Sequence, residues 1–134
     1  MKEKTSTLFL PSLIIGDLLA ILMVTLLGFI FHGESIASPR WLTTFLPYAA
    51  AWALQAPWLG LYEPEIAGDW RKSWWRAALS GLLAAPLAGL LRAMMLSSVV
   101  IPVFVIVLAL TAAAGMAIWR IMFSMRSPQV GKNG

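Results

Sequence analysis

Four long apolar segments, separated by short polar ones, dominate this chain of 134 residues. Each is about as long as the roughly 20 helical residues that cross the hydrocarbon core of a bilayer. The segments cover about residues 8–31, 41–61, 74–92 and 98–123. A backbone inside lipid must satisfy its own hydrogen bonds, and the alternating pattern of a membrane β-barrel is absent. The sequence therefore predicts an all-α polytopic membrane protein, a bundle of four transmembrane helices.

The composition agrees with a membrane-embedded chain. Hydrophobic residues make up 60% and charged residues 12% of the sequence, whereas soluble domains average about 45–50% apolar and about 25% charged. The length suits one membrane domain over residues 1–134. The chain has no cysteine and a single histidine, so we predict no disulfide, no metal site and no cofactor.

Lysine and arginine are distributed unevenly between the two sides that four spans define. An even number of spans places both termini and the linker 62–73 on one side, and only Arg40 and Arg92 on the other. The shared side holds Lys2, Lys4, Arg71, Lys72, Arg76, Arg120, Arg126 and Lys132. Basic residues favour the cytoplasmic side, so we predict a protein of the inner (plasma) membrane with both termini cytoplasmic. The net charge of +4 then serves contact with lipid headgroups, and we predict no nucleic-acid partner.

The third apolar segment carries rows of small residues. Gly81, Ala85 and Gly89 recur every fourth position, so they lie on one face of a helix. Small side chains let a neighbouring helix approach closely, and such contacts drive helix association in lipid. We therefore expect the third helix to form the buried centre of the bundle.

Asp17 lies inside the first apolar segment, where a carboxylate costs on the order of 2.5–3.5 kcal/mol to insert. Its helical stripe otherwise carries mostly small residues, so we predict that Asp17 faces the bundle interior. We expect no lysine or arginine at the same depth on another helix, which leaves Ser80, Thr111 or a carbonyl freed by a proline as partners.

Two interpretations of Asp17 remain open. As a hydrogen-bonding clamp between helices, it should tolerate asparagine, which supplies similar hydrogen bonds. As a proton or cation site, it should lose its role with the same substitution, because asparagine has no titratable charge.

A second polar group lies where two helices reach the predicted outer surface. His32 and Glu34 follow the first apolar segment, and Arg92 ends the third. Such a cluster could bind an anionic headgroup or respond to pH. The same residues could also be ordinary charges of surface turns.

Scattered residues along the chain resemble a known family. They are Gly16-Asp17, Gly28 with His32, Trp41, Trp70 with Trp74, Leu91-Arg92, Phe104, and Trp119-Arg120. In this order they are similar to the domain-of-unknown-function 3054 family of bacterial membrane proteins, over about residues 16–120. The resemblance implies a four-helix membrane protein and no particular reaction, because the family has no established activity.

Three functions of different classes fit these features, and none is enzymatic because no catalytic set of residues is visible. The first is an accessory subunit that contacts lipid and other membrane subunits or a second copy of itself. The second is a small permease or a proton- or cation-coupled channel that uses Asp17. The third is a lipid- or quinone-handling protein at the outer surface, with His32 and Arg92 as ligands. We favour the first, because a single charge within four short spans gives little basis for transport.

Overall fold

The computed structural model describes the backbone of residues 2–126 and the side chains of residues 10–126. Every regular element in this part of the chain is a helix. The long helices are α1 (Lys2–Phe31), α4 (Trp70–Leu96) and α5 (Pro102–Arg126). The shorter elements are α2 (Leu42–Gln55), α3 (Pro64–Ala67), and the 3₁₀ turns η1 (Pro39–Trp41) and η2 (Ala56–Leu59).

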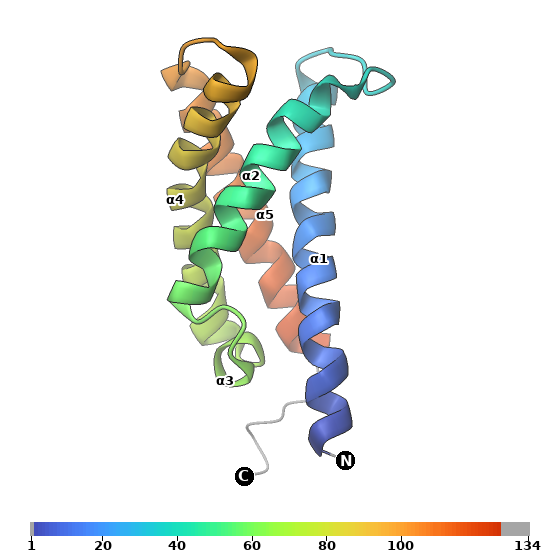
Figure 1. Ribbon diagram of the computed structural model, residues 1–134. Coiled ribbons are helices and arrows are strands. Elements are labelled where there is room, and N and C mark those ends of the chain that lie inside the picture. Colours follow the sequence, from blue (N-terminus) through green and yellow to red (C-terminus); the bar gives the residue numbers. More distant parts are fainter. Residues whose placement is uncertain (1, 127–134) are drawn as a thin grey trace.

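The chain runs up and down a bundle (Figure 1). α1 rises from one end, α2 descends across the bundle, α4 rises again and α5 descends behind α2. The start of α1 and the end of α5 therefore share one end, which we call the terminal end. The connections at 32–41 and 97–101 lie at the opposite end, which we call the distal end.

Three of these helices are long and apolar enough to cross a bilayer: α1 from Leu10, α4 and α5. The structure thus supports the four-span prediction only in part. α2 has 14 residues, or about 21 Å at the helical rise, which is short for a hydrocarbon core of about 30 Å. Pro57 lacks the N–H that an α-helix needs, and Gly60 at φ 73° ends η2. The apolar segment 41–61 is therefore a broken helix.

α4 is longer than the predicted segment 74–92. It begins at Trp70, because the Asp69 carboxylate accepts a hydrogen bond of 3.0 Å from the Arg71 backbone N–H and caps the first turn. It ends at Leu96, where Ser97 adopts a left-handed conformation with φ 50°. As a consequence, Arg92 lies within the helix, one turn before its end.

α4 has the largest buried share of the three long helices. Gly81, Ala85 and Gly89 are all buried, and a Cβ added to Gly81 would lie 2.9 Å from the Cα of Ala113 on α5. α2 packs on another face of α4, where the Tyr48 hydroxyl donates a hydrogen bond of 3.0 Å to the Gly81 carbonyl. The small residues of α4 therefore let α2 and α5 of this same chain pack closely against it.

Candidate functional site

Asp17 and Arg120 form a buried ion pair between α1 and α5. Arg120 donates from Nε to Asp17 Oδ1 at 2.9 Å and from Nη2 to Oδ2 at 2.7 Å. Both side chains are almost completely buried, with exposed fractions of 1% and 0%. This two-pronged geometry is the strongest that an arginine and a carboxylate adopt.

Neighbouring groups complete the environment of the pair. Trp119 donates from its indole nitrogen to Asp17 Oδ1 at 2.8 Å, and Arg120 donates from Nη1 to the Leu61 carbonyl at 2.5 Å. The Arg120 guanidinium also lies over the ring of Tyr62, 5.3 Å from its centre. The pair therefore joins α1, α5 and the linker after α2.

These contacts correct the expectation that Asp17 has no basic partner at its depth. Asp17 faces inward as predicted, but Arg120 is not a charge of the membrane surface. The proposed partners do not contact it: Thr111 donates to carbonyls of its own helix, and the Ser80 hydroxyl has no partner among the described residues. α1 and α5 run in opposite directions (Figure 1), and the ion pair shows that Asp17, near the middle of α1, lies level with Arg120 in the later half of α5.

The tyrosine beside the pair is protonated at neutral pH. Burial raises the pKa of the Tyr62 phenol above its usual value, and the nearby Asp17 carboxylate raises it further. The phenol oxygen accepts a hydrogen bond of 2.9 Å from the Trp52 indole. The network thus extends from α1 and α5 to the core of α2.

A groove of about 700 Å³ opens in the distal half of the bundle. Its walls come mainly from α1 and α5, and include Leu27, Phe29, Val103, Val107 and Leu108. The first turn of α2 contributes Thr43 and Thr44. A volume of this size is typical of sites that hold small molecules.

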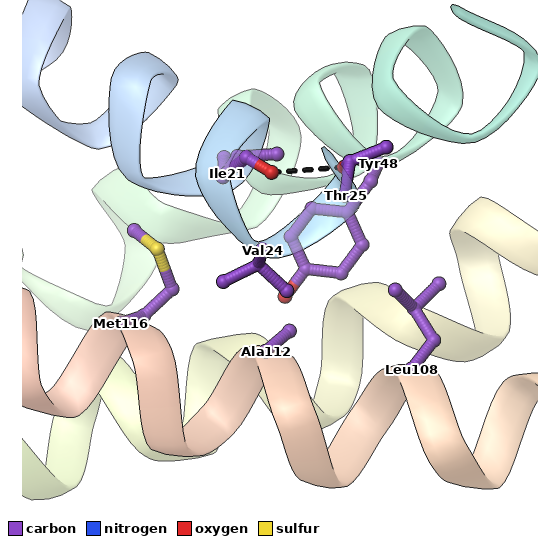
Figure 2. A pocket seen from close by; sticks show the side chains of 7 residues that line it. All are labelled: Ile21, Val24, Thr25, Tyr48, Leu108, Ala112 and Met116. Carbon is purple, nitrogen blue, oxygen red and sulfur yellow. Dashed lines mark hydrogen bonds between the residues drawn. The ribbon is translucent and has the colours of Figure 1, made fainter. Parts of the chain in front are cut away.

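Tight packing closes the inner end of the groove. Figure 2 shows Ile21, Val24 and Thr25 of α1 facing Leu108, Ala112 and Met116 of α5, with Tyr48 of α2 inserted between them. The space left among these side chains admits no water molecule. Val24, Thr25 and Leu108 also line the groove, so this seam is its floor.

The groove brings together the second group of residues singled out in the sequence. His32, Glu34 and Arg92 all line it, although they belong to two segments far apart in the chain. Arg40 lines it as well. All four lie at or near the distal end, so charge collects at one end of the groove, and apolar side chains with a few threonines line the rest. Asp17 lines neither this groove nor the seam below it.

Two polar groups in the groove lack hydrogen-bond partners within residues 10–126. The Thr44 side chain is 5% exposed, and its hydroxyl makes no hydrogen bond. Arg92 places its guanidinium 4.8 Å from the ring centre of Phe104, while its Nε makes no hydrogen bond. Buried polar groups are usually paired, so these two unpaired groups mark the polar part of the groove lining.

Sequence reasoning missed Arg120 and Trp119 at the ion pair, and Arg40 and Thr44 at the groove. The depth of Arg120 depends on where α5 begins, at Pro102, and the apolar pattern does not fix that start. Thr44 carries no signal, since a threonine near a helix start is common and its burial depends on how α1 packs against α2.

Comparison with protein families matches residues 14–123 to a family described as "Protein of unknown function (DUF3054)". Among curated proteins and among solved structures, nothing matches this chain. The matched range contains the ion pair and the groove residues. The resemblance found in the sequence is therefore confirmed, and the chain belongs to the DUF3054 family.

Proposed function

We propose that this protein binds a lipid-like amphiphile in the groove, within the membrane and without catalysing a reaction on it. The single observation that carries this proposal is the form of the groove, with about 700 Å³ between apolar walls and charged residues at one end. A lipid or a quinone has the matching form, a long apolar part with a polar head. The role corresponds to the lipid- or quinone-handling function among the three considered from the sequence.

For the orientation, we propose that α2 with η1 and η2 makes a fourth crossing and that both termini are cytoplasmic. The path in Figure 1 supports this, because the chain passes from the distal end to the terminal end between α1 and α4. Arg120 no longer counts toward the charge bias, since it is buried. The remaining basic residues in the sequence still favour a cytoplasmic terminal end, namely Lys2, Lys4, Arg71, Lys72, Arg76, Arg126 and Lys132.

Partly exposed tryptophans support the same placement of the terminal end. Trp70, Trp74 and Trp75 begin α4, and Arg76 lies over the Trp75 ring at 4.7 Å. Aromatic rings of this kind favour the headgroup level of a bilayer. The distal end, with the charged end of the groove, then faces the outer surface of the inner membrane.

Transport through Asp17 receives less support than binding in the groove. Its two carboxylate oxygens accept three hydrogen bonds from Arg120 and Trp119, so a cation would have to compete with a buried guanidinium. The carboxylate also lines neither the groove nor the tightly packed seam at its inner end. We assign Asp17 the clamp role.

The accessory-subunit role loses its main argument. Its basis in the sequence was the set of small-residue rows, and Gly81, Ala85 and Gly89 pack against helices of this same chain. Association with other membrane subunits, or with a second copy, stays a prediction without a surface assigned to it.

The test is to identify lipids and quinones that remain bound after purification in a mild detergent. Gly28 lines the groove and has no atom within 4 Å of an added Cβ, so Gly28→Trp places an indole in the groove. Leu19→Trp is the matched control, because Leu19 is 59% exposed on α1 and lies outside the groove.

We expect an amphiphile to co-purify stoichiometrically with the wild type and with Leu19→Trp, and to be lost from Gly28→Trp. Thermal unfolding of both variants checks that they remain folded. Equal retention by the two variants, or no bound amphiphile in the wild type, would contradict the proposal.

A further inference from the structure

We infer that the groove selects an anionic phospholipid, whose phosphate binds Arg92 and Arg40 at the distal end. This inference rests on the proposed function and specifies the head of the ligand. It starts from the charges that line the groove: two arginines, one glutamate and one histidine. Without counting the histidine, two arginines and one glutamate leave an excess of positive charge at this end of the groove.

Arg92 is the stronger of the two anchors. It is half-buried at the top of α4, and no carboxylate among the described residues forms an ion pair with it. Its contact with Phe104 orients the guanidinium plane at 4.8 Å from the ring centre, and its buried Nε has no acceptor. A half-buried guanidinium that forms no ion pair binds phosphate oxygens well, because its N–H groups match their geometry.

Arg40 and Glu34 determine how much charge the head can carry. Neither forms an ion pair within the described part of the chain, although both line the groove. Glu34 repels an anion, but it also disfavours a second negative charge on the ligand. A phosphodiester with a single negative charge fits this set better than an apolar head. An ammonium on the head would be attracted by Glu34 but repelled by two arginines, so the net charge favours a head without one.

The first turn of α2 adds neutral donors. Thr44 is buried with an unpaired hydroxyl, and no side chain caps the N-terminus of α2. α2 continues η1 without a break, and the Leu42 backbone N–H donates to carbonyls of η1, so the free donor here is the Thr44 hydroxyl. An ester or phosphate oxygen near Thr44 would satisfy its hydroxyl, while the acyl chains lie along Leu27, Val103 and Val107.

The test compares phosphatidylglycerol with phosphatidylcholine of identical acyl chains, titrated onto the full chain in detergent and read by native mass spectrometry. We expect the wild type to prefer phosphatidylglycerol by about tenfold: both lipids offer the same phosphodiester to the arginines, but phosphatidylcholine adds a quaternary ammonium that the excess positive charge repels. Arg92→Gln and Arg40→Gln should each reduce the preference toward parity. Arg71→Gln, at the terminal end, should keep it.

The outcomes separate this inference from the proposed function. If both lipids bind equally to the wild type and both are lost from Gly28→Trp, the groove binds amphiphiles and the headgroup assignment is wrong. If neither lipid binds, the headgroup assignment is wrong, and the co-purification of lipids and quinones with the wild type decides the proposed function separately. Inorganic phosphate is added as a competitor, and displacement of the lipid at millimolar phosphate would overturn the assignment to a lipid. If Arg92→Gln does not fold, the lipid preference of Arg40→Gln tests the inference, because Arg40 is exposed.

Discussion

At the scale of single residues, one buried ion pair organises the terminal half of the protein. Asp17 and Arg120 share two hydrogen bonds, and each has a further partner in Trp119 or the Leu61 carbonyl. Removing one member of such a pair leaves the other charge buried without compensation. The contact between α1 and α5 therefore depends on the charges of Asp17 and Arg120. The clamp expected from the sequence depended on hydrogen bonds alone.

This difference reverses the expected effect of asparagine at position 17. Asp17→Asn and Arg120→Gln should each destabilise the fold by about 3–5 kcal/mol, because each strands a buried charge. The double variant should recover most of the loss, since two neutral amides can bond to each other. Detergent or thermal unfolding of the two single variants and the double variant measures the coupling.

Arg126→Gln is the matched control, because Arg126 is an exposed arginine in the last turn of the same helix. It should change stability by less than about 0.5 kcal/mol. Additive losses in the double variant would show that the two side chains do not stabilise each other.

The sequence predicts part of this residue-scale picture. The inward orientation of Asp17 follows from the small residues on its stripe, with Ile15 and Leu18 exposed on other faces of the helix. The sequence does not predict Arg120 as the ion-pair partner of Asp17, because Arg120 lies near the end of an apolar segment and is expected at the membrane surface. Depth along the bundle depends on where each helix begins, and α5 begins at Pro102, several residues later than predicted.

At the scale of helices, glycines decide how closely α4 and α5 approach. A Cβ on Gly81 would come within 2.9 Å of Ala113 Cα and 3.0 Å of its backbone nitrogen, so a backbone would have to move. A Cβ on Gly28 of α1 would meet nothing within 4 Å. The same substitution should therefore have opposite effects at the two positions.

We expect Gly81→Ala to destabilise by about 1–3 kcal/mol, as overpacking does. Gly28→Ala should stabilise by about 0.5–1 kcal/mol, because alanine loses less conformational freedom in a helix. Unfolding midpoints of the two variants in one detergent provide the measurement. A loss at Gly28 as large as at Gly81 would refute this account of the helix contact.

The limits of sequence reasoning at this scale have local causes. Hydropathy places the apolar segments well, but it carries no signal for the break at Pro57 that divides 41–61 into α2 and η2. The start of α4 at Trp70 depends on the Asp69 cap, a single hydrogen bond. The small-residue rows of α4, by contrast, predict its central place because they need a close neighbour.

At the scale of the whole molecule, the terminal end and the distal end of the bundle are expected on opposite sides of the membrane. The start of α1 and the end of α5 share the terminal end, and the 32–41 connection lies at the distal end (Figure 1). Reporter fusions after Gly134 and within residues 35–38 should therefore report opposite sides, with the C-terminal fusion cytoplasmic. Reporters on the same side would mean that α2 does not cross the membrane.

The groove depends on this arrangement and was not predictable as a cavity. His32, Glu34 and Arg92 could be assigned to one end of the bundle from the sequence alone. The hollow between α1 and α5 could not, because it depends on how far the two helices separate beyond their contacts at Asp17 and Gly16. An added Cβ at Gly16 would overlap the Trp119 ring, so the helices meet tightly there and open toward the distal end.

The central claim is that an amphiphile occupies the groove, and buried methyl groups test it most directly. Thr25 and Thr44 line the groove yet are only 4% and 5% exposed, so lipids around the outside of the bundle cannot reach them. With the protein in deuterated detergent and a protonated phosphatidylglycerol added, NMR should show nuclear Overhauser contacts from the lipid to both threonine methyls. Ala85, equally buried but outside the groove, should show none. Lipid contacts confined to exposed methyls, with none at Thr25 and Thr44, would contradict the account.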